Sequence, residues 1–191
     1  MSVEANRVRK PRADSLRNRE QLLEAAKAAF GEIGADAPLE EIARRAGVGI
    51  GTLYRHFPTR EALLAAVYRR EVEQLSGSAE TLLAERQPAE ALEAWLHLLV
   101  DYMATKRMIA PALQASPGEG AAAYASSGAA ISAAMARLAG AAITSGDIVA
   151  VTPDDLTRML MGVAYGYDQP GWEPSARRLI GIMMAGLRRS R

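Results

Sequence analysis

The chain has 191 residues, of which 49% are hydrophobic and 24% charged, and it contains no cysteine. This composition is typical of a folded chain of one or two domains and excludes a largely disordered protein. The absence of cysteine excludes disulfides, thiol catalysis and cysteine-bound zinc. The first twenty residues are polar and arginine-rich, and no apolar run reaches the ~18 residues that span a bilayer. We therefore expect a cytoplasmic protein with no membrane segment.

The formal net charge is only +1, but the charge is distributed unevenly. Residues 1–70 contain 13 Lys and Arg against 9 Asp and Glu, a net charge of +4. Residues 71–191 contain 10 against 13, a net charge of −3. The positive charge of the N-terminal part suits attraction to phosphate, although an imbalance of this size is weak support by itself.

Residues 1–14 form a basic tail without apolar periodicity, containing Arg7, Arg9, Lys10 and Arg12. We expect this tail to be disordered in the free protein; the alternative is a basic arm that touches the backbone or minor groove of DNA. A helix is predicted from about Ser15 to Gly34, because apolar residues then recur at helical spacing. Its predicted buried stripe is Leu22, Leu23, Ala26, Phe30 and Ile33.

The stretch PLEEIARRAGVGIGTLYRHF, residues 38–57, has the pattern of two short helices joined by a tight turn. Pro38 suits the first helical position, and Gly47 suits a left-handed helix end. Leu53 and Phe57 are predicted to face inward from a second helix that spans about residues 50–57. Two short helices joined by a glycine-containing turn form a helix-turn-helix. The outer side of the second helix carries groups suited to base edges and phosphates, namely Ile50, Thr52, Tyr54, Arg55 and His56.

The sequence EEIARRAGVGIGTLYRHFPTREAL resembles the DNA-binding segment of the TetR family of transcriptional regulators. The resemblance covers roughly residues 15–68 and implies that the second helix enters the major groove. It places Ile50, Gly51 and Thr52 near bases and Tyr54, His56 and Arg60 near phosphates. Arg44 and Arg55 complete the candidate DNA-binding set. One departure is Gly49, where the family often has Ser or Thr, because glycine offers no hydroxyl to a phosphate.

A long helix is predicted to begin after Thr59, which is a suitable cap, and to end at Gly77. The sequence Ser76-Gly77-Ser78 is predicted to break this helix and to separate two domains. The predicted division is a tail at 1–14, a helix-turn-helix domain at 15–76 and a helical ligand-binding and dimerisation domain at 77–191. The expected fold class is all-α, since no strand pattern is present.

The C-terminal part reads as a series of helices. Short helices are predicted at about 79–86 and 107–115, flanking a longer one at 88–105, and Pro111 is expected to break or kink the chain. After a loop at 116–120, an alanine-rich helix runs to about residue 145. Thr152 is expected to cap the next helix, and after a tight loop at 168–171 Pro174 is expected to open the last one.

The last two predicted helices each carry an apolar stripe, and glycines permit close crossing. Each helix can give only one side to its own core, so these stripes predict a homodimer interface built as a four-helix bundle. The predicted interface residues are Leu156, Met159, Leu160, Val163, Leu179, Ile180, Met183 and Leu187.

No catalytic, metal or cofactor site is predicted. His97 and Asp101 share a helix face but lack a third ligand or base, and no nucleophile elbow is present. We expect instead an apolar ligand pocket where three helix stripes converge. Its predicted lining is Trp95, Leu99, Tyr102, Met103, Met108, Tyr124, Ile131 and Met135.

Few polar groups lie near this predicted pocket, so the expected ligand is small and hydrophobic or aromatic. The positive charges of Lys106 and Arg107 also allow a ligand that carries a carboxylate. Together with the resemblance, this predicts a homodimeric repressor that binds a palindromic operator in double-stranded DNA and leaves it when the ligand binds. The alternatives are a DNA-binding regulator without a small-molecule effector, controlled by a protein partner, and a helical enzyme or carrier.

Overall fold

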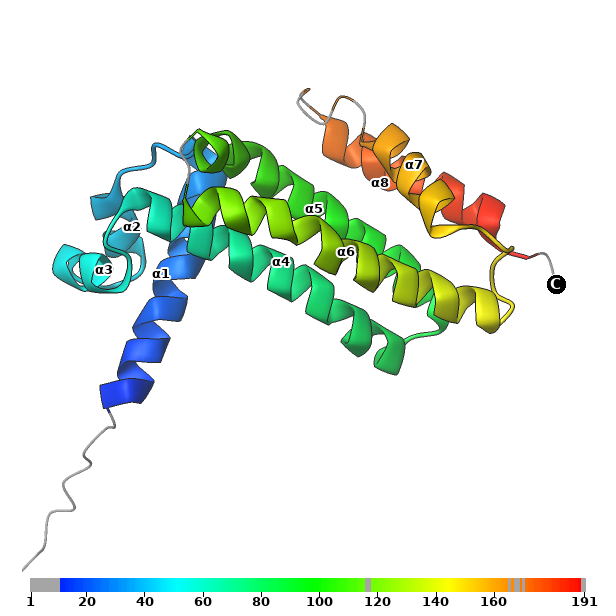
Figure 1. The fold of residues 1–191 in the computed structure, drawn as a ribbon, viewed down its shortest axis with the longest axis horizontal. Coiled ribbons are helices and arrows are strands. Elements are labelled where there is room, and N and C mark those ends of the chain that lie inside the picture. Colours follow the sequence, from blue (N-terminus) through cyan, green and yellow to red (C-terminus); the bar gives the residue numbers. More distant parts are fainter. Residues whose placement is uncertain (1–10, 116–117, 165, 167–168, 170, 190–191) are drawn as a thin grey trace, which may run out of the picture.

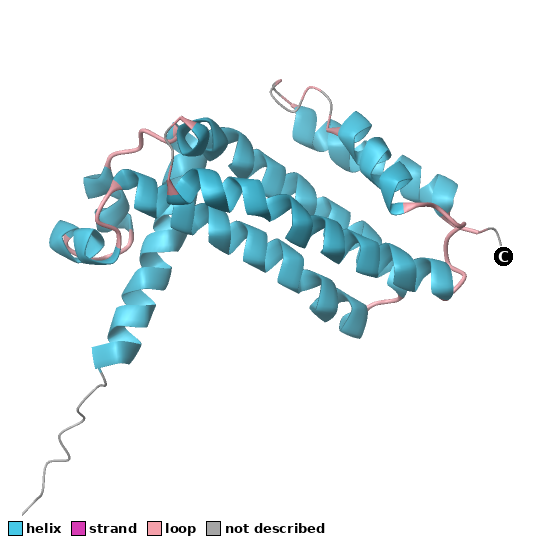
Figure 2. Cartoon of the chain, viewed as in Figure 1, coloured by secondary structure: helices cyan, strands magenta, loops and turns pink. Residues whose placement is uncertain are grey.

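The computed structural model describes residues 11–115, 118–164, 166, 169 and 171–189, and Figure 1 shows its fold. These residues form eight α-helices and no β-strand (Figure 2), which confirms the predicted all-α class. An isolated antiparallel bridge between Ile148 and Arg188 holds the C-terminal end against the segment after α6. None of the described helices is long and apolar enough to cross a lipid bilayer.

The N-terminal end is built from α1 (Pro11–Ile33), α2 (Leu39–Arg45) and α3 (Ile50–His56). Helix α1 begins inside the predicted tail, and residues 1–10 lie outside the described part. The predicted stripe of α1 is buried except for Ile33, whose side chain is 51% exposed. Ile33 is the last helical residue, and the chain turns at Gly34 with a φ of 102°, so this side chain does not follow the stripe into the core.

Helix α4 (Arg60–Glu85) is continuous, so the predicted break at Ser76-Gly77-Ser78 is wrong. The hydroxyl groups of Ser76 and Ser78 donate to the helix's own carbonyl oxygens at Val72 and Leu75, each at 2.8 Å. Leu75 and Ala79 are buried on either side of Gly77. Tertiary packing therefore overrides the local preference of Ser and Gly for a loop.

Helix α5 (Pro88–Gln114) joins two predicted helices into one and contains Pro111 within its last turns. Its neighbour α6 (Glu119–Thr144) confirms the predicted alanine-rich helix, with Met135, Leu138 and Ala142 buried. A helix can include proline when packing on its inner face outweighs the one lost hydrogen bond. Ile109 and Leu113, on either side of Pro111, supply that packing.

Helix α7 (Pro153–Val163) begins as predicted, because the Thr152 hydroxyl accepts a hydrogen bond from the Asp155 amide at 3.1 Å. Helix α8 (Trp172–Leu187) begins two residues before the predicted Pro174, after Gly171 in the left-handed conformation with a φ of 77°. Residues 168 and 170 of the predicted loop lie outside the described residues, as do Ser116 and Pro117.

Helices α4, α5 and α6 lie side by side, with α1 to α3 at one end and α7 and α8 packed along α5 and α6 (Figure 1). One continuous hydrophobic core runs from Leu22 in α1 to Leu187 in α8. Because α4 begins beside α3 and continues into this bundle, the small N-terminal helices are directly connected to the larger C-terminal part.

Candidate DNA-binding surface and apolar pocket

The turn between α2 and α3 is set by backbone geometry. Gly47 has a φ of 68°, as predicted for a left-handed helix end, and the Val48 amide donates to the Ala43 carbonyl at 3.0 Å. Leu53 is fully buried on the inner side of α3, and Phe57 is buried just after it. Arg19 of α1 lies 5.4 Å from the centre of the Phe57 ring, which further ties α3 to α1.

The outer side of α3 carries the residues predicted to contact DNA. Ile50, Gly51, Tyr54 and Arg55 are exposed, with Tyr54 at 46%, whereas Thr52 and His56 are half-buried. Gly49 is the N-cap, and no side chain at this position bonds the amides of the first turn. The six predicted α3 residues therefore come from one short helix, and their contact with DNA stays a prediction.

Three charged residues of α2 form one hydrogen-bonded group. Glu41 accepts two hydrogen bonds from Arg44, each at 2.7 Å, and one from Arg45 at 2.8 Å. These contacts, with Arg44 first, lower the pKa of Glu41 to about 2. Arg45 also reaches Glu32 of α1 at 2.8 Å. Arg44, a predicted DNA contact, is thus exposed but already held by a carboxylate.

Arg60, predicted to contact phosphate, binds the protein's own backbone. Its Nη1 atom donates to the carbonyl oxygens of Ala35 at 2.9 Å and Ala37 at 2.6 Å. The side chain is half-buried and fastens the start of α4 to the turn between α1 and α2. This structural role was not apparent from the sequence, since it joins residues more than twenty positions apart.

The predicted dimer interface is divided between the inside and the outside of the chain. Leu156, Ile180 and Leu187 are buried within the chain's own core, so they are not available to a partner in this structure. Met159, Leu160, Val163 and Met183 are half-buried against the same core, and only Leu179 is exposed among the predicted residues. Sequence reasoning missed the most exposed apolar side chains here, Met161 and Ile182, each 69% exposed.

The predicted pocket lining is also dispersed. Trp95 is fully buried, and its Nε1 atom donates to the Leu75 carbonyl at 2.8 Å. Met108 instead reaches the turn after α1, where its Cε atom lies 3.9 Å from the position that a Cβ would take at Gly34. Met135 is buried, and Tyr124 and Ile131 are half-buried against the core.

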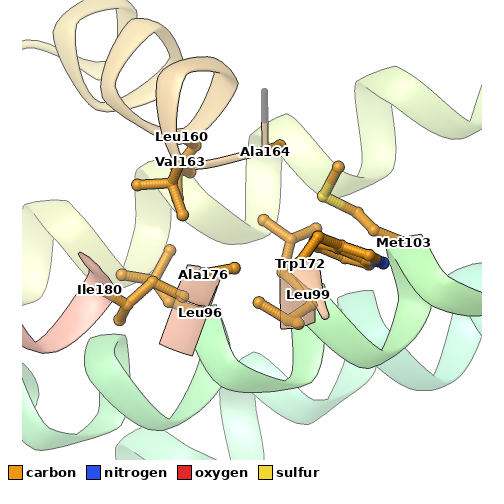
Figure 3. A pocket seen from close by; sticks show the side chains of 10 residues that line it. Leu96, Leu99, Met103, Leu160, Val163, Ala164, Trp172, Ala176 and Ile180 are labelled. Carbon is orange, nitrogen blue, oxygen red and sulfur yellow. The ribbon is translucent and has the colours of Figure 1, made fainter. Parts of the chain in front are cut away.

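An apolar pocket is present between α5, α7 and α8, and of the predicted residues it includes Leu99 and Met103 (Figure 3). Helix α5 also contributes Leu96 and Val100. The other side is formed by Leu160, Val163, Ala164, Trp172, Ala176 and Ile180. The cavity has a volume of about 10 Å³, roughly the space of one water molecule. The sequence stripe marked α7 and α8 as apolar but could not show that they cover α5.

A chain of hydroxyl groups joins α4, α5 and α6. The Tyr68 hydroxyl lies 2.7 Å from that of Tyr102 and 2.8 Å from Ser127 Oγ, which donates to the Tyr124 carbonyl at 2.7 Å. The rings of Tyr68 and Tyr124 stack at 5.8 Å between centres. Burial, and next the contact with Tyr68, raise the pKa of Tyr102, so its phenol stays neutral.

The sequence did not single out Tyr68 or Ser127. Both are among the buried residues, and Ser127 is one of only two buried polar or charged residues in the described part. A tyrosine within an apolar helix stripe was the available indication, because a buried phenol needs a hydrogen-bond partner.

His97 and Asp101 lie one helical turn apart on α5. Asp101 is paired with Arg177 of α8, which fixes α8 against α5. No group of three potential metal ligands is found among the described side chains.

Two family models match different parts of the chain. Residues 22–67 match the model described as bacterial regulatory proteins, tetR family. Residues 87–189 match the model described as transcriptional regulator SbtR-like, C-terminal domain. The two matches lie on either side of residue 76, but the exact domain division stays a prediction.

The chain is similar over nearly its whole length to a solved TetR transcriptional regulator from Streptomyces coelicolor. The identity is 43%, the TM-score is 0.80, and the alignment covers 91% of this chain and 99% of the other. A TetR regulatory protein from Mycobacterium vanbaalenii is 35% identical, with a TM-score of 0.77 and coverage of 93% and 99%.

A curated relative, an HTH-type transcriptional regulator from Staphylococcus aureus, is 35% identical over 79 residues. That match covers 40% of this chain and about two fifths, 41%, of the relative's length. These relatives are regulators of transcription, not enzymes. The chain therefore belongs to the TetR family of DNA-binding transcriptional regulators.

Proposed function

We propose that this protein is a cytoplasmic homodimeric repressor that binds a palindromic operator through α3 and is released by a small, mainly apolar ligand. The observation that carries the DNA-binding part is the α2–turn–α3 unit, with Ile50, Gly51 and Tyr54 exposed on one short helix. Tyr54 and His56 are proposed to contact phosphates, and Ile50 and Thr52 to contact bases. One such helix reads too few bases, so two copies about one helical turn apart, ~34–36 Å, are required.

The exposed apolar side chains of α7 and α8 support a dimer. Met161, Leu179 and Ile182 are exposed to solvent. Large apolar side chains that are grouped on an exposed face commonly mark an interface. A twofold axis would bring α8 of one protomer against α8 of its partner, where Gly186 is exposed and permits close approach. We therefore propose the exposed residues Met161, Leu179 and Ile182 as interface residues. They take the place of the buried residues Leu156, Ile180 and Leu187.

The apolar pocket under α7 supports ligand control. It holds about 10 Å³, so a ligand larger than water must move α7 or α8 away from α5. A ligand that binds the moved arrangement better shifts the dimer toward it and thereby lowers affinity for the operator. A regulator without a small-molecule effector, controlled by a protein partner, is the second candidate, and the closed state of this pocket favours it.

The test is selection of binding sites from random DNA duplexes with the purified full-length protein. The expected result is an enriched palindrome whose half-sites lie about one helical turn apart. Tyr54→Ala is expected to weaken binding to all duplexes, whereas Thr52→Ala is expected to change which sequence is preferred. Thr81→Ala, an exposed change far along α4, is the control. Recovery of no common sequence would remove the proposal, and unchanged binding by Tyr54→Ala would remove the phosphate assignment.

A further inference from the structure

Lys106 of α5 is a half-buried cation that rests on aromatic rings. Its Nζ atom lies 4.7 Å from the centre of the Tyr124 ring and 6.0 Å from that of Tyr102. Aromatic faces attract an ammonium group but do not neutralise its charge. None of the ion pairs between described residues includes Lys106.

Two other half-buried basic side chains of the described part, Lys27 and Arg70, are paired with carboxylates. Lys27 binds Glu71 at 2.8 Å, and Arg70 binds Glu20 at 2.6 Å as well as Glu24. A partly buried charge without an opposite charge is unfavourable. Lys106 therefore differs from these residues in that its anionic partner is not supplied by the described part of the chain.

Lys106 lies between two features already described. It follows Met103 by three residues and Tyr102 by four, so helical geometry places it one turn further along α5, between the directions of these two adjacent side chains. Met103 lines the apolar pocket (Figure 3), and Tyr102 ends the buried hydroxyl chain. A ligand with an apolar body in the pocket could place its end beside Lys106, which lies ~4.5 Å further along the helix axis than Met103.

The groups at this end of the pocket define the chemistry of that ligand. One ammonium group provides one positive charge, and the neutral Tyr102 phenol does not compete for it. The pocket lining is otherwise apolar. A single negative charge is matched by Lys106, whereas the second charge of a phosphate monoester would be desolvated without a partner.

We propose that Lys106 binds the carboxylate of the effector and that the effector is an apolar monocarboxylate whose hydrocarbon part enters the pocket between α5, α7 and α8. The proposal rests on ligand control of the proposed repressor and specifies the class of ligand. The carboxylate replaces the missing counter-ion of Lys106, and the hydrocarbon part separates α7 from α5. Both changes occur within about one turn of the same helix.

The experiment compares carboxylates with neutral amides of the same shape, in calorimetric titrations of the full-length protein without DNA. The probes are octanoate with octanamide, and phenylbutyrate with phenylbutyramide. A charge-assisted hydrogen bond predicts that at least one carboxylate binds about tenfold or more tightly than its amide. Lys106→Met is expected to remove this preference without weakening the amide, and Lys106→Arg is expected to keep it.

Arg158→Met is the matched control, because it also removes one positive charge, but from the exposed surface of α7. It is expected to keep the preference for the carboxylate. Lys106→Gln serves as a second neutral variant if Lys106→Met does not fold. Equal binding of carboxylate and amide by the natural protein overturns the proposal, as does a preference that survives in Lys106→Met or binding of none of the four probes. Because DNA is absent, failure of operator binding affects the proposed function separately.

Discussion

The hydroxyl oxygens of Tyr68 in α4 and Tyr102 in α5 lie 2.7 Å apart, and both side chains are buried. Tyr68 also reaches Ser127 of α6 at 2.8 Å, so one phenol connects all three long helices. Because Ser127 donates onward to a carbonyl oxygen, the hydroxyl hydrogens can follow one direction, from Tyr102 through Tyr68 to Ser127. Because Tyr68 bonds both of the other hydroxyl groups, it contributes more of these hydrogen bonds than either of them.

Tyr68→Phe is therefore expected to lower the free energy of unfolding by about 1–3 kcal/mol, because it removes the hydroxyl that bonds both buried groups, Tyr102 and Ser127. Urea denaturation followed by circular dichroism measures this change. Tyr124→Phe is the matched control, since it removes a phenol hydroxyl from a ring that stacks on Tyr68 but takes no part in the chain. If the two variants lost the same free energy of unfolding, the chain of hydroxyl groups would contribute no more to stability than a single tyrosine hydroxyl outside it.

Arg60→Ala is expected to destabilise the protein by about 1.5–3 kcal/mol, because a charged donor leaves two carbonyl oxygens of the turn between α1 and α2. Denaturant titration gives the value. Arg55→Ala is the comparison, since Arg55 is exposed and bonds only within its own helix. Its expected loss is about 0.5 kcal/mol or less. If both variants were equally stable, Arg60 would have to be returned to a purely DNA-contacting role.

Ile182→Glu is expected to convert the proposed dimer to monomers, because a twofold interface would receive two charges at once. Sedimentation velocity at several protein concentrations measures the outcome. Leu16→Glu is the control, because Leu16 has the same 69% exposure but lies on α1. A dimer that persists in Ile182→Glu places the interface elsewhere. Met183 is less suitable for this test, since it packs partly against the chain's own core.

The stability difference between the natural protein and Glu41→Gln is expected to depend on pH. Hydrogen bonds from Arg44 and then Arg45 lower the Glu41 pKa from 4.5 to about 2, so the folded state favours the ionised carboxylate. The resulting stabilisation is complete above the unfolded pKa and is lost as pH falls through about 2. Thermal melts from about pH 7 down to about pH 2 should show the difference shrinking only in acid. Because the group is exposed, salt should also reduce it.

The order and type of the helices could be predicted from the sequence because they depend on local signals. Thr59 and Thr152 cap helices as expected, and Gly47 takes the predicted left-handed conformation. The predicted breaks failed at Ser76-Gly77-Ser78 and near residue 106, where burial of neighbouring side chains keeps the helix intact. The helix propensities of ordinary residues differ by roughly 1 kcal/mol or less, and the packing of buried side chains stabilises the helix by more than that.

The candidate site was less accessible from sequence. An apolar stripe shows that a helix buries one face but not whether its own chain or a second copy covers it. Leu160, Val163 and Ile180 were predicted to face a partner, and in the structure they line the pocket over α5. Contacts such as Arg60 with Ala35 and Tyr68 with Ser127 join distant positions, and no spacing rule within one helix predicts them.

Because α4 is one continuous helix, a movement at one of its ends also displaces the other end. Its 26 residues span about 39 Å at 1.5 Å per residue. A tilt of about 5° at the Glu85 end would displace the Arg60 end by about 3 Å, and in a symmetric dimer the two recognition helices would separate by up to about twice that amount. Against a half-site spacing of ~34–36 Å, such a change is enough to put one helix out of register with its groove. A break at Gly77 would absorb the same tilt locally, so the unbroken helix allows a small movement in the C-terminal bundle to reach the DNA.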